Sequence, residues 1–346
     1  MLWDLFCRVI DNFGDIGVCW RLAADLAARG ETVRLWVDDP APLRWMAPHG
    51  APRVDVLGWT DEADVAEPGD VVIEAFGCDP PPAFVTRMAA RAPAPRWINL
   101  EYLSAESYVT RSHGLRSPQL SGPGRGLDKW FFYPGFEAGT GGLIRESGLM
   151  EERRRFDGAA WLQAHGWAPR PGERVLSLFC YPAAPLQPLL SDLATQPTLL
   201  LATPGVAASA AALAQAPLRC IQLPWLSQAD YDRLLWSCDL NFVRGEDSFV
   251  RAQWSGVPFV WQIYPQGDGA HAAKLRAFLD LLLAGRSDAF AARLRALWYA
   301  WNGLGRWPDT WPEPQPWRTL AADWRDRLAA QPDLGTQLLR FVAGKR

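Results

Sequence analysis

Two carboxylates stand four residues apart in a glycine-containing segment near the start of the chain. The segment is Val9-Ile10-Asp11-Asn12-Phe13-Gly14-Asp15-Ile16-Gly17, and it joins an apolar stretch to an amphipathic one. The first strand-to-helix turn of an open α/β sheet lies where ligands collect. The dinucleotide fingerprint needs three glycines there, and only Gly14 and Gly17 are present, so a nicotinamide site is disfavoured. The segment indicates a general base beside a cleft. Helix capping is the ordinary alternative for Asp11 and Asp15, because Asp often caps turns.

A second segment with chemical potential is Arg244-Gly245-Glu246-Asp247-Ser248-Phe249-Val250-Arg251-Ala252-Gln253-Trp254. It follows an apolar stretch and is predicted to open a helix, for which Asp247 or Ser248 is an ordinary N-cap. Free backbone N–H groups at such a helix start also suit a diphosphate, and Arg244 and Arg251 could add positive charge. The spacing alone leaves the cap and the phosphate site as alternatives.

Aromatic residues recur after predicted strand ends in the second half. Singly, each is a candidate core residue, but together they could stack a nucleobase, and a tyrosine hydroxyl could reach a phosphate. This group, with one interspersed glutamine, comprises Phe179, Tyr181, Trp225, Gln228, Tyr231 and Tyr264.

Composition narrows the class of protein. The 346 residues are enough for two domains. The 49% apolar and 21% charged content indicates a globular protein, and the net charge of −3 favours neither nucleic acid nor an anionic membrane. Six cysteines without a CxxC pair and four scattered histidines predict a reduced protein with no metal site. Without a signal peptide or an apolar membrane span, we expect a cytoplasmic protein. The tryptophans crowded into the last fifth are most simply core residues.

Short continuous apolar stretches alternate with helical segments along both halves. Such strands suit a parallel sheet covered on both faces, so the fold class is α/β, with doubly wound sheets. The interdomain connection is placed at about 150–172, after a glycine- and proline-rich stretch at 117–148. The predicted strands are 2–10, 32–37, 54–57, 71–76, 96–100, 174–181, 198–203, 219–223, 240–243 and 259–263. The predicted helices are 18–29, 151–165, 186–194, 206–214, 228–237 and 248–254, followed by a helical C-terminal region.

These segments amount to a family resemblance. Residues 3–22, from Trp3 to Leu22, and residues 244–254 resemble the two signatures of the bacterial protein-arginine rhamnosyltransferases that modify elongation factor P, the EarP family. The stretch 258–266 continues the second signature, and the resemblance covers the whole chain in length and order.

The resemblance implies a GT-B fold: two facing Rossmann-like domains with an interdomain cleft and no metal requirement. Residues 1–155 would form the acceptor-side domain, completed by about 330–346, and residues 170–330 the donor-side domain. The implied reaction is inverting transfer of L-rhamnose from dTDP-β-L-rhamnose to an arginine in the N-terminal domain of elongation factor P. That modification would activate the factor for rescue of ribosomes stalled at polyproline.

The resemblance also assigns roles to residues. Asp15 matches the general base, Asp11 a second essential acid and Glu246 the glutamate of the second signature. The residues implied in donor binding are Asn12, Phe13, Gly14, Gly17, Phe179, Tyr181, Trp225, Gln228, Tyr231, Arg244, Asp247, Ser248 and Tyr264.

The chemistry supports a carboxylate at this position. The arginine guanidinium is a poor nucleophile because it is protonated at neutral pH and its lone pairs are delocalised. A carboxylate can align it, localise its charge and accept a proton as the C–N bond forms. Two other interpretations stay open: a GT-B nucleotide-sugar enzyme with a small-molecule acceptor, and a non-catalytic adaptor that binds a nucleotide sugar and a translation factor.

Overall fold

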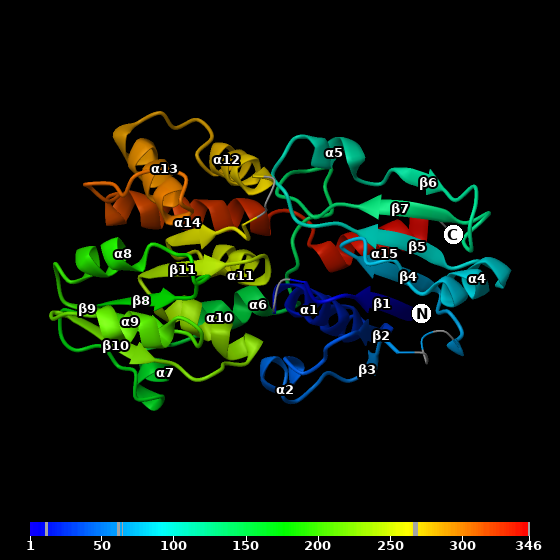
Figure 1. The fold of residues 1–346 in the computed structure, drawn as a ribbon, viewed down its shortest axis with the longest axis horizontal. Coiled ribbons are helices and arrows are strands. Elements are labelled where there is room, and N and C mark those ends of the chain that lie inside the picture. Colours follow the sequence, from blue (N-terminus) through cyan, green and yellow to red (C-terminus); the bar gives the residue numbers. More distant parts are fainter. Residues whose placement is uncertain (11–12, 61–62, 64, 266–268, 345–346) are drawn as a thin grey trace. The chain divides into compact units, whose positions relative to one another are not determined.

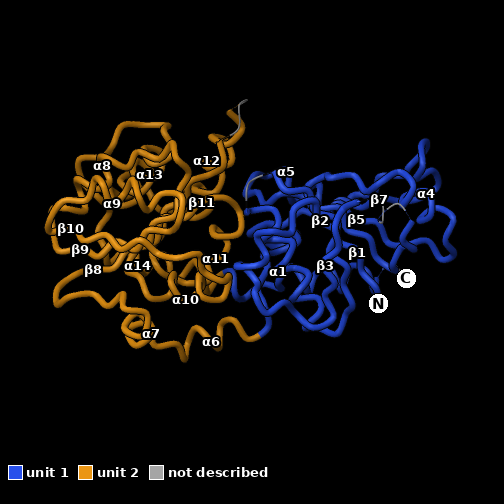
Figure 2. Tube along the Cα trace, turned by 60° about the horizontal axis from the view of Figure 1, so that its bottom comes forward, with its two compact units in different colours: residues 1–147, 328–346 blue, residues 148–327 orange. Residues whose placement is uncertain are grey.

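The chain divides into two compact units. The computed structural model describes residues 1–346 except 11–12, 61–62, 64, 266–268 and 345–346. Unit 1 comprises residues 1–147 and 328–346, and unit 2 comprises residues 148–327 (Figure 2). We expected the first domain to extend to residue 155, but the division falls before α6 (Leu149–Arg155). The reason is that α6 interacts within unit 2: Glu152 pairs with Arg233, and Arg153 donates to the Ser255 carbonyl.

Unit 1 is built on a sheet with the strand order β3-β2-β1-β4-β5-β7-β6. All its neighbouring strands are parallel except β6 and β7. Its elements are β1 (Leu2–Cys7), α1 (Gly14–Ala28), β2 (Thr32–Val37), α2 (Leu43–Met46), β3 (Val54–Gly58), β4 (Val71–Ala75), α4 (Pro82–Ala90), β5 (Arg96–Leu100), α5 (Tyr108–Ser112), β6 (Arg116–Pro118), β7 (Asp128–Phe132) and α15 (Leu334–Gly344).

Unit 2 repeats this plan with the entirely parallel order β10-β9-β8-β11-β12. After α6 its elements are α7 (Gly158–Ala164), β8 (Arg174–Leu178), α8 (Leu186–Leu193), β9 (Thr198–Ala202), α9 (Ala207–Leu213), β10 (Leu218–Gln222), α10 (Gln228–Ser237), β11 (Leu240–Arg244), α11 (Asp247–Ser255), β12 (Phe259–Gln262), α12 (Ala270–Leu282), α13 (Ala289–Trp301) and α14 (Pro314–Ala329). The end of α14 belongs to the segment assigned to unit 1. Figure 1 shows each sheet as a layer with helices on both sides.

Burial on both faces explains why the strands are apolar throughout rather than alternating. Every residue of β4 and of β9 is buried, as expected for parallel strands covered by helices. The fold is α/β and GT-B, with two Rossmann-like domains, and the prediction of parallel sheets is confirmed except at one edge. There β6 pairs antiparallel with β7. Both strands lie in the stretch that we interpreted only as rich in glycine and proline.

Several predicted element boundaries were wrong. The predicted helix 18–29 begins at Gly14, and the predicted strand 174–181 ends at Leu178. The first strand ends at Cys7 rather than residue 10, because the next backbone N–H groups bond to side chains instead of the sheet: Val9 donates to Asp38 and Ile10 to Asp15. The predicted helix 151–165 is two helices, because Phe156 is extended and Asp157 caps the second by accepting from Ala160.

Four of the tryptophans near the C-terminus, Trp298, Trp301, Trp317 and Trp324, are core residues as predicted, whereas Trp307 and Trp311 are half-buried. Trp298 and Trp301 are fully buried, and Trp324 donates to the buried Gln253. Trp307 and Trp311 both donate to the Asp192 carboxylate, at 2.6 and 2.7 Å, and thereby fasten the loop after α13 to α8. The high number of tryptophans in this part of the chain therefore reflects packing within unit 2.

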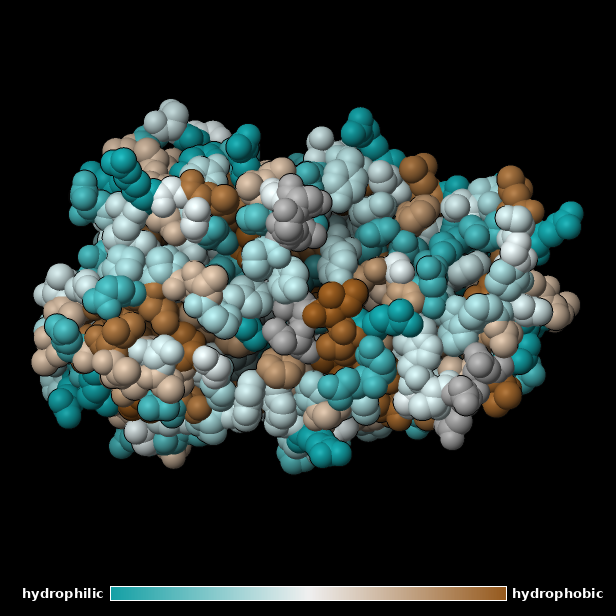
Figure 3. Space-filling model, in the orientation of Figure 1, coloured by the Kyte–Doolittle hydropathy of each residue, from teal (hydrophilic) through white to brown (hydrophobic). Residues whose placement is uncertain are grey.

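Hydrophilic and hydrophobic residues are interspersed on the visible face of the molecule (Figure 3). Such a mixture is normal for globular proteins, whose surfaces remain largely apolar. Within the part of the chain that the structure describes, none of the helices has both the length and the apolar character needed to cross a bilayer.

Candidate functional site

Both predicted segments lie at the switch point of their own sheet. When the strands of each unit are numbered in sequence order, both sheets contain the order 3-2-1-4-5. The connections turn in opposite directions on either side of strands 1 and 4, and ligands bind beyond the carboxyl ends of these two strands. Strands 1 and 4 are β1 and β4 in unit 1, and β8 and β11 in unit 2. In unit 1, Asp15 follows β1, which neighbours β4. In unit 2, Phe179 follows β8 and Ser248 follows its neighbour β11. The topology thus explains why these turns gather side chains capable of chemistry.

Asp15 lies in the first turn of α1 rather than in a loop before it. Its side chain is only 3% exposed, and Oδ2 accepts a hydrogen bond of 2.8 Å from the Ile10 backbone N–H. Asp15 is therefore not the helix cap, because Phe13 occupies the N-cap position and the helix has no side-chain capping bond. Its carboxylate binds the backbone of the preceding loop instead.

The neighbouring predicted residues shape the start of α1. Gly14 is its first residue, and the Gly17 N–H donates to the Phe13 carbonyl at 3.0 Å, which forms the first helical turn. The Phe13 ring packs edge-to-face against Trp45, with centroids 5.3 Å apart. Asp11 and Asn12 lie outside the described residues.

An arginine stacked on aromatic rings forms the centre of the unit 2 site. The Arg244 guanidinium lies 4.3 Å from the ring centroid of Phe179 and 4.5 Å from that of Tyr181. Its Nη1 also donates to the Cys180 carbonyl at 3.4 Å. Such stacking holds a planar cation in place and leaves its edges available for an anion.

Further predicted aromatic residues surround this arginine. Tyr231 packs edge-to-face on Phe179 at 5.9 Å, and Tyr264 on Tyr181 at 5.6 Å. Burial raises the pKa of Tyr231 well above its ordinary value, so its hydroxyl stays protonated as a donor. Trp225 lies in the loop between β10 and α10 and is 46% exposed.

The start of α11 is not capped by the residues that we expected. Neither Asp247 nor Ser248 is the N-cap: Glu246 takes that position without a side-chain capping bond, and Asp247 begins the helix. The Ser248 hydroxyl instead accepts from the Arg244 N–H at 3.1 Å and donates to the Arg244 carbonyl. Gly245 permits this tight turn with a φ of 61°. Glu246 is half-buried.

Gln228 joins the same cluster from α10. It is the first residue of that helix, and its Nε2 donates to Asp247 Oδ2 at 3.2 Å. The structure therefore brings together, within unit 2, the predicted residues Phe179, Tyr181, Gln228, Tyr231, Arg244, Asp247, Ser248 and Tyr264.

The suggestion that Arg251 adds charge to a phosphate site is wrong. Its side chain is buried and forms two hydrogen bonds of 2.8 Å with the Asp232 carboxylate. Sequence reasoning also missed Gln262, whose Oε1 accepts from the Tyr181 N–H at 2.7 Å. No local pattern identifies such long-range partners, although a charged residue on the apolar face of a helix is a hint of one.

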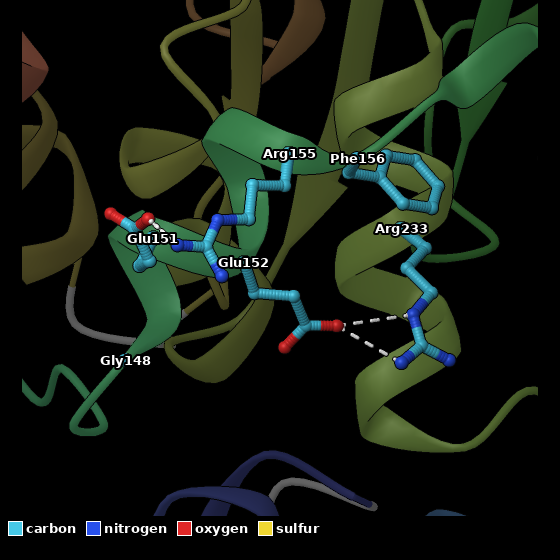
Figure 4. A pocket seen from close by; sticks show the side chains of 6 residues that line it. All are labelled: Gly148, Glu151, Glu152, Arg155, Phe156 and Arg233. Carbon is cyan, nitrogen blue, oxygen red and sulfur yellow. Dashed lines mark hydrogen bonds and ion pairs between the residues drawn. The ribbon is translucent and has the colours of Figure 1, made fainter.

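A separate hollow of about 470 Å³ lies between α6 and α10 in unit 2, with none of the predicted site residues in its lining. In Figure 4, Glu152 points toward Arg233, and Glu151 is paired with Arg155. These carboxylates and guanidinium groups satisfy one another at the surface, so the lining indicates a solvated ion-pair network rather than a ligand site. The residues that line it are Gly148, Glu151, Glu152, Arg155, Phe156 and Arg233.

Apart from the residues left undescribed, no group of three or more His, Cys, Asp or Glu side chains is arranged to hold a metal ion.

Comparison with known proteins gives the family. Residues 3–343 match the family described as "Elongation-Factor P (EF-P) rhamnosyltransferase EarP". Protein-arginine rhamnosyltransferases of Pseudomonas aeruginosa and Pseudomonas putida are 44% and 46% identical to this chain. The alignments cover 99% and 98% of this chain, and 98% of each relative.

Solved structures agree. The chain is 33% identical, with a TM-score of 0.65, to a structure described as the basis for EarP-mediated arginine glycosylation of translation elongation factor EF-P. That match covers 100% of this chain and 99% of the other. The spinosyn rhamnosyltransferase SpnG, at 15% identity and a TM-score of 0.56 over 99% and 100% of the two chains, shares the fold. This chain is a glycosyltransferase that uses a nucleotide-sugar donor, and it belongs to the EarP family of elongation factor P rhamnosyltransferases.

Proposed function

We propose that this enzyme transfers L-rhamnose from dTDP-β-L-rhamnose to an arginine side chain in the N-terminal domain of elongation factor P, with inversion at the anomeric carbon. The modified factor would then rescue ribosomes stalled at polyproline, which places the reaction in the cytoplasm. The observation that carries the proposal is the contrast between the two helix starts. One presents the buried carboxylate of Asp15, and the other presents an arginine stacked on aromatic rings.

Unit 1 is the acceptor side in this proposal, and Asp15 is its general base. A guanidinium nitrogen attacks the anomeric carbon of rhamnose, and the bond from that carbon to the diphosphate oxygen breaks. The nitrogen loses its proton to Asp15, and dTDP leaves with the bonding electron pair. Asp11 would grip a second edge of the guanidinium, because charge-assisted bonds to two carboxylates fix its plane.

Unit 2 is the donor side. Phe179, Tyr181, Tyr231 and Trp225 would hold the nucleobase and ribose by stacking and by the tyrosine hydroxyls. The Tyr231 hydroxyl suits this role, because it is buried near Ser248 and stays protonated as a donor. Gln228 would add an amide donor to the same pocket.

The departing diphosphate would be stabilised by Arg244, Ser248, Tyr264 and the N–H groups at the start of α11, where the helix dipole favours negative charge. Asp247 would accept from a donor hydroxyl. We assign Glu246 to a hydroxyl of the sugar or ribose, or to the incoming guanidinium, since a carboxylate beside a diphosphate would be repelled. Asn12, Phe13, Gly14 and Gly17 would complete the donor contacts from the loop that carries Asp15.

The experiment that tests the proposal is intact-mass analysis of the cognate elongation factor P after incubation with this enzyme and dTDP-β-L-rhamnose. We expect a gain of one deoxyhexose on an arginine, lost when that arginine is replaced by lysine. Parallel incubations with UDP-β-L-rhamnose and with free arginine test the base and the acceptor. Donor consumption with a small acceptor alone would favour the small-molecule enzyme. Donor binding without transfer would favour the adaptor.

A further inference from the structure

Two rungs of polar contacts join α10 to α11, and the first rung is formed by two of the candidate donor residues. The first rung is Gln228 with Asp247, at 3.2 Å, and the second is Asp232 with Arg251. The partners in each rung are 19 residues apart in sequence. Gln228 and Asp232 are one helical turn apart on α10, as Asp247 and Arg251 are on α11. The two helices therefore run in the same direction, with their first turns side by side.

The second rung is a bidentate arginine–carboxylate pair, which is the strong and directional form of this contact. Arg251 Nε donates to Asp232 Oδ1, and Nη2 donates to Oδ2, both at 2.8 Å. The side chain of Arg251 is 0% exposed and that of Asp232 is 6% exposed. Parallel bonds between two planar groups are directional, so they specify one relative position of the helices. Burial removes the water that would otherwise replace either partner.

From this geometry we infer that Arg251 and Asp232 are positioning residues for the nucleotide-sugar site: their bidentate pair fixes the axial register of α10 against α11. Neither residue would touch the donor. A slip of one turn would move the helices by about 5.4 Å and separate Gln228 and Tyr231 from Asp247 and Ser248. The inference rests on the proposed donor site in unit 2.

An apolar pair would serve stability equally well, and this makes the role testable. Replacing a buried ion pair by apolar residues of similar volume is often neutral or stabilising, whereas apolar contacts lack direction. If the pair only stabilises the fold, an apolar replacement that folds will bind donor normally. If it sets the register, that variant will fold but bind poorly.

The first measurement is calorimetric titration of dTDP into the full chain carrying Arg251→Lys, which keeps the charge but cannot form both bonds. We expect dTDP binding at least tenfold weaker than for wild type. The matched control is Arg219→Lys, because Arg219 forms an equivalent bidentate pair with Glu173 in the same unit, at 3.0 and 2.7 Å. That control should bind dTDP within about twofold of wild type.

The second measurement uses the double variant Asp232→Leu with Arg251→Met, which leaves no unpaired charge if a single variant fails to fold. We expect a melting temperature near that of wild type, a raised donor KM and a largely retained kcat at saturating donor. Wild-type dTDP affinity in a folded Arg251→Lys protein or in the double variant would overturn the inference. Failure of the wild-type chain to bind dTDP would instead overturn the proposed function.

Discussion

Helices α1 and α11 carry the two candidate sites in their first turns, and their chemistry is opposite. At the start of α1, Asp15 offers a buried carboxylate that accepts from the Ile10 N–H of its own loop. At the start of α11, Ser248 is bound to the Arg244 backbone, and the Arg244 guanidinium lies over Phe179 and Tyr181. In the proposed function, the same strand-turn-helix arrangement binds a cation in unit 1 and an anion in unit 2.

The two helices also differ in how they are anchored beyond the site. In α11, Arg251 reaches across to Asp232 of α10, and both carboxylate oxygens are bonded. In α1, Asp25 pairs with Arg29 one turn on, and Arg29 extends to Asp333 before α15. The buried Oδ1 of Asp25 has no hydrogen-bond partner among the described residues. Both carboxylate oxygens are therefore bonded in the α11 anchor (Arg251 and Asp232), whereas one buried carboxylate oxygen in the α1 anchor (Asp25, Arg29 and Asp333) has no such bond among the described residues.

The largest expected effect is that of Asp15→Asn, which should impair the α1 site and leave the α11 site unchanged. Asparagine can still accept from the Ile10 N–H, so the turn should form, but the proposed general base is lost. We expect kcat to fall by about 10²–10⁴-fold while dTDP affinity stays unchanged. Rhamnosylation time courses followed by intact mass, with calorimetric dTDP titration, measure both quantities.

Asp38→Asn is the matched control for that variant. Asp38 Oδ1 accepts from the Val9 N–H at 2.9 Å in the same loop, and the side chain is exposed. Its turnover should remain within about twofold of wild type. Normal turnover by Asp15→Asn would exclude Asp15 as the base and remove the proposed contrast.

The α1 anchor predicts a pH dependence of stability. Burial raises the pKa of Asp25 from its ordinary 3.8 to about 6, against the opposing effect of Arg29, and nearby Asp333 and Glu146 raise it further. The folded protein therefore binds this proton more tightly than the unfolded chain. The contribution of Asp25 to stability is full below pH 3.8 and is lost as the pH rises through 6.

Asp25→Asn removes this titration. The free energy of unfolding of the variant minus that of wild type should therefore increase between pH 4 and pH 7, by up to about 3 kcal/mol. Urea denaturation at a series of pH values measures the slope, which is separate from any constant loss of the Arg29 contact. Parallel profiles for the two proteins would contradict the assignment of Asp25.

Close packing at the α1 anchor predicts a smaller effect from Gly335→Ala. A Cβ at Gly335 would collide with Asp25 Oδ2 and would lie 3.0 Å from Arg29 Nε. Because both groups are held in the ion pair, we expect a loss of about 1–3 kcal/mol in the free energy of unfolding. Gly344→Ala, on the same helix with open space around it, should be neutral or slightly stabilising. Equal melting temperatures for the two variants would contradict this prediction, because they would show that Asp25 and Arg29 can move to accommodate the added methyl group.

The smallest expected effect is that of Trp225→Ala on the donor side. The ring is 46% exposed, so its removal should leave the melting temperature within a few degrees of wild type. Loss of one stacking platform should weaken dTDP binding about tenfold, within the roughly 1–3 kcal/mol typical of a stacked base. Leu304→Ala, at an exposed apolar residue of the same unit, is the control. Unchanged dTDP affinity in the Trp225 variant would exclude this ring from the base pocket.

Local patterns in the sequence predicted much of this molecule. Continuous apolar stretches such as Val71–Ala75 and Thr198–Ala202 do form buried parallel strands, because burial on both faces suppresses alternation. Both signature segments do lie at strand-to-helix turns, where topology places them at the switch point of each sheet. Fold class, family and the candidate residues followed from these two kinds of pattern.

The tertiary structure alone decided how the polar residues are shared between chemistry and anchoring. Arg251 and Arg244 are equally cationic in sequence, yet one is buried against Asp232 and the other stacks on Phe179 and Tyr181. In the sequence, Asp25 likewise looks like an ordinary acidic residue of α1, but in the structure it is buried where Gly335 of α15 packs against it. The physical reason is that helical periodicity specifies which face a side chain occupies, whereas its partner comes from a distant segment. Desolvation by that segment determines whether a charge is paired internally or remains available to a ligand.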